Sequence, residues 1–325
     1  MLVLSRADVE AVLSMDVAIE AVARGARESS AGRATIPLRV RFPVPEAPAY
    51  SGYMPGYLPA LGALGIKIVG NFPRNRERGL ALNQGVFLLL DGQSGQALAV
   101  MDASALTELR TAALTGAAGR LLARPDARTG LILGAGAEAR SHVLALAEAL
   151  QLDCLAVWAR RRQQAEAVVA ELAPRVPGLR LEVADSAAEA TRQADVVAAT
   201  TSAEEPVLFG DWLGPGTFVS SVGHPRQGVE LDPSVVERAD VVSVDDRTAA
   251  LAESTDLRGP LERGVIRPDD LVELGELVGG TRPGRSGPDQ VILFKSVGFA
   301  AADLAAGQEV YRMARERGLG VEVGL

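Results

Sequence analysis

The stretch LILGAGAEARSHVLALAEAL, residues 131–150, combines an apolar segment, a glycine turn and a helical segment. Its turn fits the pattern G-x-G-x-x-A, placed after an apparent strand and before a helix. This is the context that a dinucleotide-binding turn needs. We therefore predict cofactor contacts along the turn, against the alternative of a ligand-free corner between strand and helix. The predicted residues are Gly134, Ala135, Gly136, Ala137, Glu138 and Ala139.

Each place in this pattern has a physical reason. Gly134 allows the tight turn, Gly136 lets the backbone approach a pyrophosphate, and the small Ala139 lets the helix pack against the strand. The start of the helix adds amides and the positive end of the helix dipole. Glu138 departs from this logic, because a carboxylate beside a pyrophosphate is repelled unless it points away.

A cluster of arginines follows the next expected strand, in AVWARRRQQAEA, residues 156–167. An NAD site usually has an acid near this point, which binds the ribose 2′-hydroxyl. Here Arg160, Arg161 and Arg162 stand instead, and a guanidinium pairs well with a 2′-phosphate. We therefore favour NADP(H) over NAD(H), with Arg160 and Arg161 as phosphate ligands. The alternative is a solvated start of a helix.

The pattern from residue 129 onward alternates between strands and helices, which predicts a parallel sheet. Strands are expected at 130–134, 153–159, 179–184, 195–200, 217–222 and 240–244, and again in VILFKSVG, 291–298.

The first hundred residues show a different spacing of apolar residues. Strands are expected in TIPLRVRF (35–42) and ALGIKIVGNF (63–72), and a hairpin at 85–102, followed by a helix at 106–123. A long last helix ends at Gly318, and we expect it to return to the N-terminal part. The expected domains are 1–115 plus 300–325, which is discontinuous, and 116–299.

The composition narrows the class of protein. The chain has 325 residues, a net charge of −8 and 48% apolar residues, which argues against a nucleic-acid surface. Its one cysteine, Cys154, lies in an apolar run and is expected to be buried, so neither a disulfide framework nor a metal site is predicted. The start MLVLSRADVE lacks a signal-peptide pattern, and no apolar run is long enough for a membrane span. We expect a cytoplasmic protein without membrane contact.

Four motifs together resemble the ornithine cyclodeaminase/μ-crystallin family. They are GIKIVGNFPRN, LTELRTAALTGAAGRLLA, LILGAGAEARSHVLAL and FKSVGFAAADLAA, in this order along essentially the whole chain. The resemblance implies an α/β fold: a Rossmann-type domain joined to an N-terminal α+β domain for substrate binding and dimerisation. It also implies a homodimer that acts on a small amino or imino acid with a nicotinamide cofactor.

The resemblance implies that three cations hold the substrate carboxylate. The matching positions are Arg39, with Arg41 as an alternative match, Lys67 and Arg110. Lys67 lies between two isoleucines in an apolar strand, so it is expected to face the opposite side, towards solvent or a polar cavity. Arg110 has the planar fork that suits a carboxylate.

Further positions follow from the same resemblance. Asn71 and Asn75 match a loop pattern, and Asn71 is assigned to the substrate side. Thr107 and Asp303 also match family positions, with helix capping as the alternative for Thr107 and capping or pairing for Asp303. Additional cofactor contacts are predicted at Thr111, Thr200, Val222, Gly223, Lys295 and Gly298.

Two acids that the family's cyclodeaminases carry are missing here. One is expected in SSVGHPRQGVELD, residues 220–232, where His224 stands near its place and no aspartate precedes Asp232. The other is expected before the Met-Pro of SGYMPGYLP, where Gly52 and Tyr53 stand. Both absences argue against cyclisation of a diamino acid.

The leading hypothesis is an NAD(P)H-dependent reductase of α-imino acids, or the equivalent amino-acid dehydrogenase, acting by hydride transfer at the α-carbon. Two residues are candidates for exchanging the proton of the nitrogen. Lys67 is one, because desolvation can bring the pKa of a lysine near neutrality, and His224 is the other, because the ordinary pKa of a histidine is already near neutrality. One alternative is ornithine cyclodeaminase, which makes proline and ammonia with catalytic NAD. Another is a non-catalytic, μ-crystallin-like binder of a dinucleotide or small ligand. The substrate side chain and the direction of the reaction stay open.

Overall fold

The computed structural model describes residues 1–47, 49–223 and 228–324. The chain forms two compact units, Met1–Arg110 with Phe299–Leu325, and Thr111–Gly298. The first division falls inside helix α3 (Ala103–Leu122), slightly before the boundary expected at residue 115. The roles expected for the two parts, substrate binding with dimerisation and cofactor binding, stay predictions. Across the described ranges, no helix combines the length and the apolar character that a membrane span requires.

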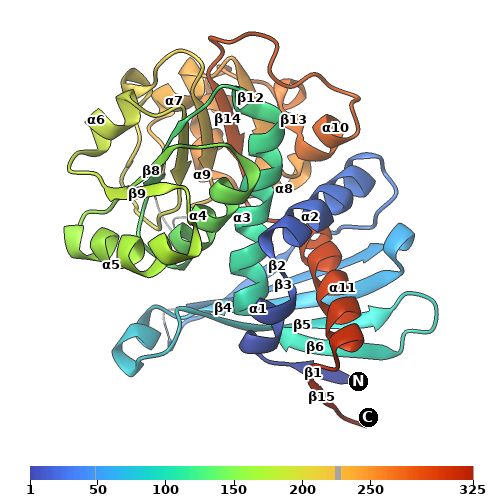
Figure 1. Ribbon diagram of the computed structural model, residues 1–325. Helices are drawn as coiled ribbons and strands as arrows, with labels where there is room; N and C mark the ends of the chain where they lie inside the picture. The colour runs from blue at the N-terminus through green and yellow to red at the C-terminus, as the bar shows by residue number, and fades with distance from the viewer. Residues whose placement is uncertain (48, 224–227, 325) are drawn as a thin grey trace. The chain divides into compact units, whose positions relative to one another are not determined.

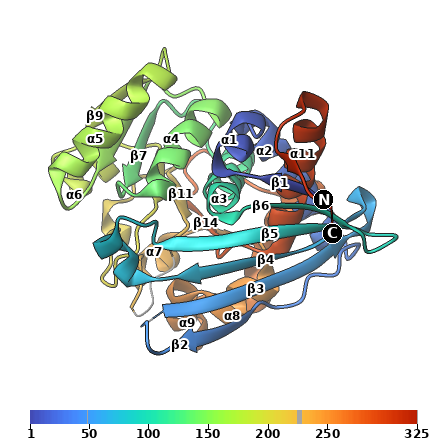
Figure 2. The ribbon, with the colours of Figure 1, turned by 90° about the horizontal axis from the view of Figure 1, so that it is seen from below.

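The first unit is built on a seven-stranded mixed sheet, in the order β15-β1-β6-β5-β4-β3-β2 (Figure 2). Its strands are β1 (Leu2–Leu4), β2 (Val40–Val44), β3 (Ala49–Leu58), β4 (Ala63–Asn71), β5 (Asn83–Asp91), β6 (Ala97–Asp102) and β15 (Val321–Glu322). Its further helices are α1 (Arg6–Val12), α2 (Met15–Ser30), α11 (Ala300–Arg317), and the 3₁₀ turns η1 (Pro59–Leu61) and η2 (Pro73–Arg78). The expected last helix is confirmed as α11, which ends at Gly318 with φ 65°.

Helix α11 lies against the sheet because glycines on the strands leave room for it (Figure 1). A Cβ added to Gly56 on β3 would lie 2.9 Å from Leu304, and one added to Gly65 on β4 would lie 3.2 Å from Leu304. On the helix, a Cβ added to Gly307 would lie 2.4 Å from Phe87 of β5. These close contacts fix the backbone of α11 over β4, where Asp303 precedes Leu304.

Strand β3 was not expected from the sequence. Its Gly52, Pro55 and Gly56 are poor strand residues, yet it pairs with β4 along its whole length. Strand β2 begins at Val40 rather than at residue 35, and Thr35 forms only an isolated bridge with Tyr57. The tertiary contact with α11 explains Gly56 of β3 better than local propensity does.

The second unit is an eight-stranded parallel sheet in the order β13-β12-β14-β11-β10-β7-β8-β9 (Figure 1). The strands are β7 (Thr129–Leu133), β8 (Cys154–Trp158), β9 (Arg180–Val183), β10 (Val196–Ala199), β11 (Phe218–Ser221), β12 (Val241–Val244), β13 (Val272–Glu273) and β14 (Ile292–Lys295). The strand order reverses between β7 and β10, and ligands of such sheets bind at the carboxyl ends beside this point. The Rossmann-type α/β fold expected from the sequence is confirmed.

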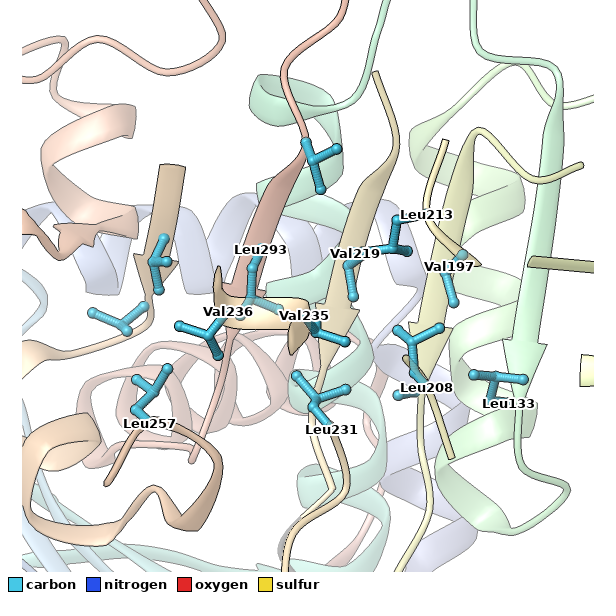
Figure 3. Close-up of a cluster of buried hydrophobic side chains, with 14 of the residues drawn as sticks. Leu133, Val197, Leu208, Leu213, Val219, Leu231, Val235, Val236, Leu257 and Leu293 are labelled. Carbon is cyan, nitrogen blue, oxygen red and sulfur yellow. The ribbon is translucent and has the colours of Figure 1, made fainter. Parts of the chain in front are cut away.

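Helices connect the parallel strands. They are α4 (Ala137–Ala149), α5 (Arg162–Leu172), α6 (Ala187–Arg192), α7 (Pro233–Arg238), α8 (Arg247–Glu253), α9 (Thr255–Glu262) and α10 (Leu274–Val278), with η3 (Ala173–Arg175), η4 (Gly210–Trp212) and η5 (Pro268–Asp270). Figure 3 shows the apolar core on one face of the sheet, where Leu133, Val197, Val219 and Leu293 come from four adjacent strands. Burial of strands on both faces explains why they appear in the sequence as continuous apolar runs. Cys154 is buried, as expected.

Candidate functional site

The glycine turn begins where β7 comes close to the residue after β10. Gly134 has φ 124°, and a Cβ added to it would lie 2.6 Å from Thr200 Oγ1. The Thr200 hydroxyl donates to Leu133 O at 3.0 Å, which holds the two strand ends together. Only glycine meets both the backbone conformation and the close approach at this place.

Gly136 differs from Gly134, because it faces open space. It is the exposed N-cap of α4, and among residues 1–47, 49–223 and 228–324 it has no side-chain capping hydrogen bond, and an added Cβ would meet no atom within 4 Å. Arg140 Nη1 donates to Ala135 O at 3.1 Å and to Gly136 O at 3.2 Å, which holds the turn in shape. An uncapped helix start beside open space fits the pyrophosphate of a dinucleotide.

His142 of α4 is fully buried and joins three elements. Its Nδ1 lies 2.7 Å from Glu138 O, so Nδ1 carries the proton and donates it. Nε2 then accepts from the Thr115 hydroxyl at 3.0 Å, and Thr115 accepts from the Ser220 hydroxyl at 2.7 Å. Burial lowers the pKa of His142 to about 4, so this histidine is neutral and structural. The Glu138 carboxylate lies 3.9 Å from the same ring, one turn along the helix.

The arginine cluster follows β8 directly beside the glycine turn, because Gly134 N donates to Trp158 O at 2.8 Å. Arg160 and Arg161 are exposed and have no hydrogen bond or ion pair with any residue that the structure describes. Arg162, in contrast, donates to Glu166 at 2.9 Å and pairs with Asp185. Two guanidiniums are therefore available to an anionic ligand, and the third is occupied.

The remaining cofactor positions expected from the sequence follow β10, β11 and β14 at the same carboxyl edge. Lys295 has a structural environment: its buried Nζ donates to Ser221 Oγ at 2.9 Å and to Gly223 O at 2.8 Å, and lies 2.6 Å from Asp256 Oδ2. If the Lys295 ammonium contacted a cofactor, it would have to give up one of these three partners. Gly298, with φ 75°, donates its amide to Asp245 Oδ2 at 2.6 Å.

A buried acid that the sequence analysis did not identify, Glu230, organises this edge. The Glu230 carboxylate accepts from Thr201 N at 2.6 Å, Ser221 Oγ at 2.7 Å and Gly223 N at 2.8 Å. A Cβ added to Gly223 would lie 2.2 Å from Glu230 Cδ, which explains the glycine. Val222 continues the ladder, with its amide donating to Ala199 O at 3.0 Å. His224 lies outside the described residues.

In the first unit, three buried charges from three elements meet. Lys67 Nζ of β4 donates to Asp303 Oδ1 of α11 at 2.7 Å, and Arg110 Nε of α3 donates to the same oxygen at 2.8 Å. Lys67 is 1% exposed, Arg110 5% and Asp303 0%. Lys67 does face away from its isoleucine neighbours, but towards the face that α11 covers rather than towards solvent, because Asp303 balances its charge there.

The electrostatics of this cluster bring the lysine into the physiological range. Burial lowers the pKa of Lys67 to about 7, helped by the nearby Arg110 and Arg39 charges and opposed by Asp303. Burial alone would raise the pKa of Asp303, but Lys67 and Arg110 outweigh it and hold that pKa below its usual value. The carboxylate is therefore ionised, while Lys67 is poised between its two forms near neutral pH.

Arg39 fits the third cationic position better than Arg41. Arg39 is half-buried in the loop before β2, and its charge acts on both Lys67 and Asp303. Arg41 lies over the ring of Tyr50 at 5.2 Å.

The other residues expected on the substrate side have ordinary local partners. Asn71 Nδ2 donates to Asn83 Oδ1 at 2.8 Å, and Asn75 Nδ2 donates to Ala81 O at 2.9 Å, which closes the loop after β4. Thr107 is not a helix cap, because α3 already begins at Ala103 and Asp102 Oδ1 accepts from Ala105 N. Thr111 is buried at the first position of the second unit.

Comparison with known proteins adds a family and several relatives. The model of the ornithine cyclodeaminase/mu-crystallin family matches residues 1–318. Δ1-pyrroline-2-carboxylate reductase of Bacillus cereus is 33% identical over 99% of each chain. The structure of the same kind of enzyme from Thermococcus litoralis, in complex with NADH and L-proline, is similar with a TM-score of 0.95 and 36% identity, over 99% of this chain and 100% of the other. An archaeal alanine dehydrogenase dimer with bound NAD is similar with a TM-score of 0.92 and 30% identity, over 100% of this chain and 99% of the other.

Proposed function

Because the chain belongs to the ornithine cyclodeaminase/mu-crystallin family, we propose that it is an NAD(P)H-dependent reductase of α-imino acids. The carbon of the C=N bond, which also bears the carboxylate, gains a hydride. The bonding pair of that double bond moves to the protonated nitrogen, and an amino acid results. A cyclic imino acid such as Δ1-pyrroline-2-carboxylate is the preferred substrate of this proposal. The buried cluster of Lys67, Arg110 and Asp303 is the observation that carries it.

The cluster suits a carboxylate ligand. Two arginines, Arg110 and Arg39, and Lys67 stand against one anion, Asp303, so two positive charges are left over when Lys67 is protonated and one when it is neutral. A buried site with excess positive charge favours an anion that can accept charge-assisted hydrogen bonds. The substrate carboxylate supplies such acceptors, and its binding orients the adjacent imine carbon.

Lys67 is also placed to handle the proton of the nitrogen. Its pKa of about 7 lets it hold or release a proton at neutral pH. A bound carboxylate adds negative charge beside it and so raises that pKa, which favours the ammonium in the substrate complex. His224 stays the other proposed proton carrier.

The second unit would hold the cofactor, which supplies the hydride when bound. Gly134, Gly136 and the uncapped start of α4 would receive the pyrophosphate. Arg160 and Arg161 support NADP(H) over NAD(H), since both are exposed near the turn and neither is paired with a residue that the structure describes. The two structural relatives are complexes with NADH and NAD, so the preference for the 2′-phosphate is a proposal specific to this chain.

Replacement of both Arg160 and Arg161 by alanine tests this preference. The Kd for NADPH is expected to rise by about 100-fold or more, because two arginines are lost and each charge-assisted hydrogen bond to a phosphate contributes roughly 1.5–3 kcal/mol. The Kd for NADH should stay within about twofold. Fluorescence titration with both cofactors measures it, and Arg162→Ala is the matched control because that side chain is already paired. An equal loss for both cofactors would refute the assignment.

The proposed activity is tested by following oxidation of NADPH and of NADH with a panel of imines. The panel holds the five- and six-membered cyclic imino acids, and pyruvate, glyoxylate or oxaloacetate with ammonia or methylamine. Rapid oxidation with a cyclic imine is expected. Release of ammonia and proline from ornithine, without net cofactor consumption, would identify a cyclodeaminase instead. Tight cofactor binding without any turnover would favour the binder.

We further propose that the protein is a homodimer, formed through the outer face of the sheet of the first unit. This face is opposite to Lys67 and presents Val40 (60% exposed), Phe42 (47%) and Val86 (43%), with Tyr53 and Ile68 between them. An apolar sheet face exposed to this extent is typical of an interface. A second copy is the favoured occupant because the similar archaeal alanine dehydrogenase is a dimer.

Val86→Asp is expected to convert the dimer into a monomer, because it places a charge in the middle of the apolar face. Sedimentation equilibrium of the wild type should give twice the mass of one chain, and of the variant a single chain mass. Val321→Asp, at the exposed strand β15, is the control and should stay dimeric. A monomeric wild type, or a dimeric Val86→Asp protein, would rule out this surface.

A further inference from the structure

One oxygen of Asp303 holds two cations that belong to two other elements. Lys67 Nζ and Arg110 Nε both donate to Oδ1, at 2.7 and 2.8 Å. The other oxygen, Oδ2, is buried and has no hydrogen-bond partner in the part of the chain that the structure describes. A buried acceptor left without a partner is costly. The arrangement therefore holds the two cations in place at Oδ1, and it leaves the second oxygen of the carboxylate without a hydrogen bond from the described residues.

The contact with Nε decides which edge of Arg110 is open to a ligand. A guanidinium is planar, so a hydrogen bond at Nε fixes both its plane and its rotation. Nη1 and Nη2 of Arg110 have no hydrogen-bond partner among the described residues. A carboxylate binds a guanidinium through two parallel N–H groups, and only the edge formed by Nη1 and Nη2 keeps both of its groups.

The backbone of Asp303 is itself held firmly. It lies in the first turns of α11, where Leu304 packs on Gly56 and Gly65 of the sheet. On the side of α2, a Cβ added to Gly25 would lie 2.7 Å from Ala301 O, so the two helices are in close contact. The carboxylate thus belongs to a rigid element and serves as a fixed reference for two longer, flexible side chains.

We propose that Asp303 is the positioning residue of the reductase: it turns the Nη1–Nη2 edge of Arg110 towards the substrate carboxylate and holds the Lys67 ammonium beside that edge. This inference rests on the proposed function. Asp303 is fully buried, and both cations lie on one of its oxygens. It acts through the two cations, which are the groups that bind.

The same carboxylate controls the charge of Lys67. The charged groups that face Lys67 are Asp303 from α11, Arg110 from α3 and Arg39 from the loop before β2. Asp303 is the single anion among them. Without its charge, the two arginines and burial act unopposed, and the pKa of Lys67 falls further below about 7. Fewer molecules then carry the ammonium at neutral pH.

The test compares Asp303→Asn with Asp303→Glu, using Δ1-pyrroline-2-carboxylate over a range of pH. Asparagine keeps the shape and removes the charge, so the KM is expected to rise about tenfold or more. The alkaline limb of kcat/KM, where Lys67 loses its proton, should move to lower pH by about one unit or more. Glutamate restores the negative charge, but its longer side chain places the carboxylate differently. The alkaline limb of kcat/KM should therefore return to its wild-type pH, while the KM stays raised.

Glu28→Gln is the matched control, because Glu28 is another buried acid of this unit, paired with Arg33 at 2.7 and 2.9 Å. It is expected to lower the melting temperature without a change in KM or in the limb. If both Asp303 variants likewise lowered the melting temperature without changing the KM or the alkaline limb, Asp303 would have a merely structural role, and the proposal would be overturned. If Asp303→Asn does not fold, Asp303→Glu decides: an unchanged KM overturns the proposal, and a raised KM with an unmoved limb supports it.

Failure of the proposed function is a separate result, since it would show as a wild-type protein that reduces no imine. Calorimetric binding of pyrrole-2-carboxylate, a planar carboxylate without a reducible bond, then tests the positioning alone. Asp303→Asn should bind it about tenfold more weakly than the wild type. Equal affinity would overturn the inference.

Discussion

Replacement of Arg110 by methionine is expected to lower kcat/KM for the imino acid by about 10²- to 10⁴-fold, because loss of one partner from a buried charge pair costs roughly 3–5 kcal/mol. In the proposed complex Arg110 would offer its terminal nitrogens to the substrate carboxylate, while its Nε donates to Asp303. Without it, the carboxylate loses its bidentate partner, and the imine carbon loses its orientation. The loss should appear in both KM and kcat, measured by steady-state kinetics with the cyclic imine.

Arg120→Met is the control for Arg110→Met. Arg120 lies on the same helix, is partly exposed and sits 3.9 Å from Glu148. Its replacement should leave kcat/KM within about twofold, as expected for a surface ion pair. Cofactor affinity should be unchanged in Arg110→Met, since Arg110 belongs to the first unit and the proposed cofactor positions belong to the second. An Arg110→Met enzyme with nearly full activity would show that the carboxylate is bound elsewhere.

The second large effect is expected at Gly136. Gly136→Val should weaken binding of NADPH and NADH by about 100-fold, because the added side chain fills the space that a pyrophosphate needs and displaces its hydrogen bonds, each worth roughly 1.5–3 kcal/mol. The unliganded protein should lose no more than about 1 kcal/mol of stability, as for an unfavourable N-cap. The backbone there, with φ −87°, accepts any residue. Fluorescence titration and thermal unfolding measure the two properties.

Gly134→Ala provides the contrast. Its Cβ would lie 2.6 Å from Thr200 Oγ1 at φ 124°, so this variant should be destabilised by about 1–3 kcal/mol even without a cofactor. The pair thus separates a glycine that the fold requires from one that a ligand requires. If Gly136→Val bound the cofactor as tightly as the wild type, the turn would be only a structural corner.

The elements of this protein that depend on neighbouring residues in the sequence could be predicted. Parallel strands such as β10 and β11 are buried on both faces, so they appear as short apolar runs between helices. The glycine turn was predictable because its short G-x-G-x-x-A pattern directly follows an apolar strand segment and precedes a helix. Strand β3 was not, because Gly56 serves contact with Leu304, which lies far along the chain.

The arrangement of the charges was beyond the sequence for the same reason. Lys67 and Asp303 are 236 positions apart, and no local signal indicates that a helix brings an acid over a lysine of a strand. The role of Glu230 could not be predicted either, because it depends on the backbone amides of Thr201 and Gly223, which donate to its buried carboxylate only in the folded structure. The family resemblance indicated the three cations and the position of Asp303, and the structure shows that Lys67 and Arg110 both donate to this carboxylate.

The most direct test of the central claim is isotope transfer. The protein is incubated with Δ1-pyrroline-2-carboxylate and NADPH that carries deuterium at the transferring position of the nicotinamide, and the product is analysed by mass spectrometry and NMR. The account predicts proline with one deuterium at the α-carbon, formed in equal amount to the oxidised cofactor. Proline without deuterium, or no proline while the cofactor binds normally, would contradict it.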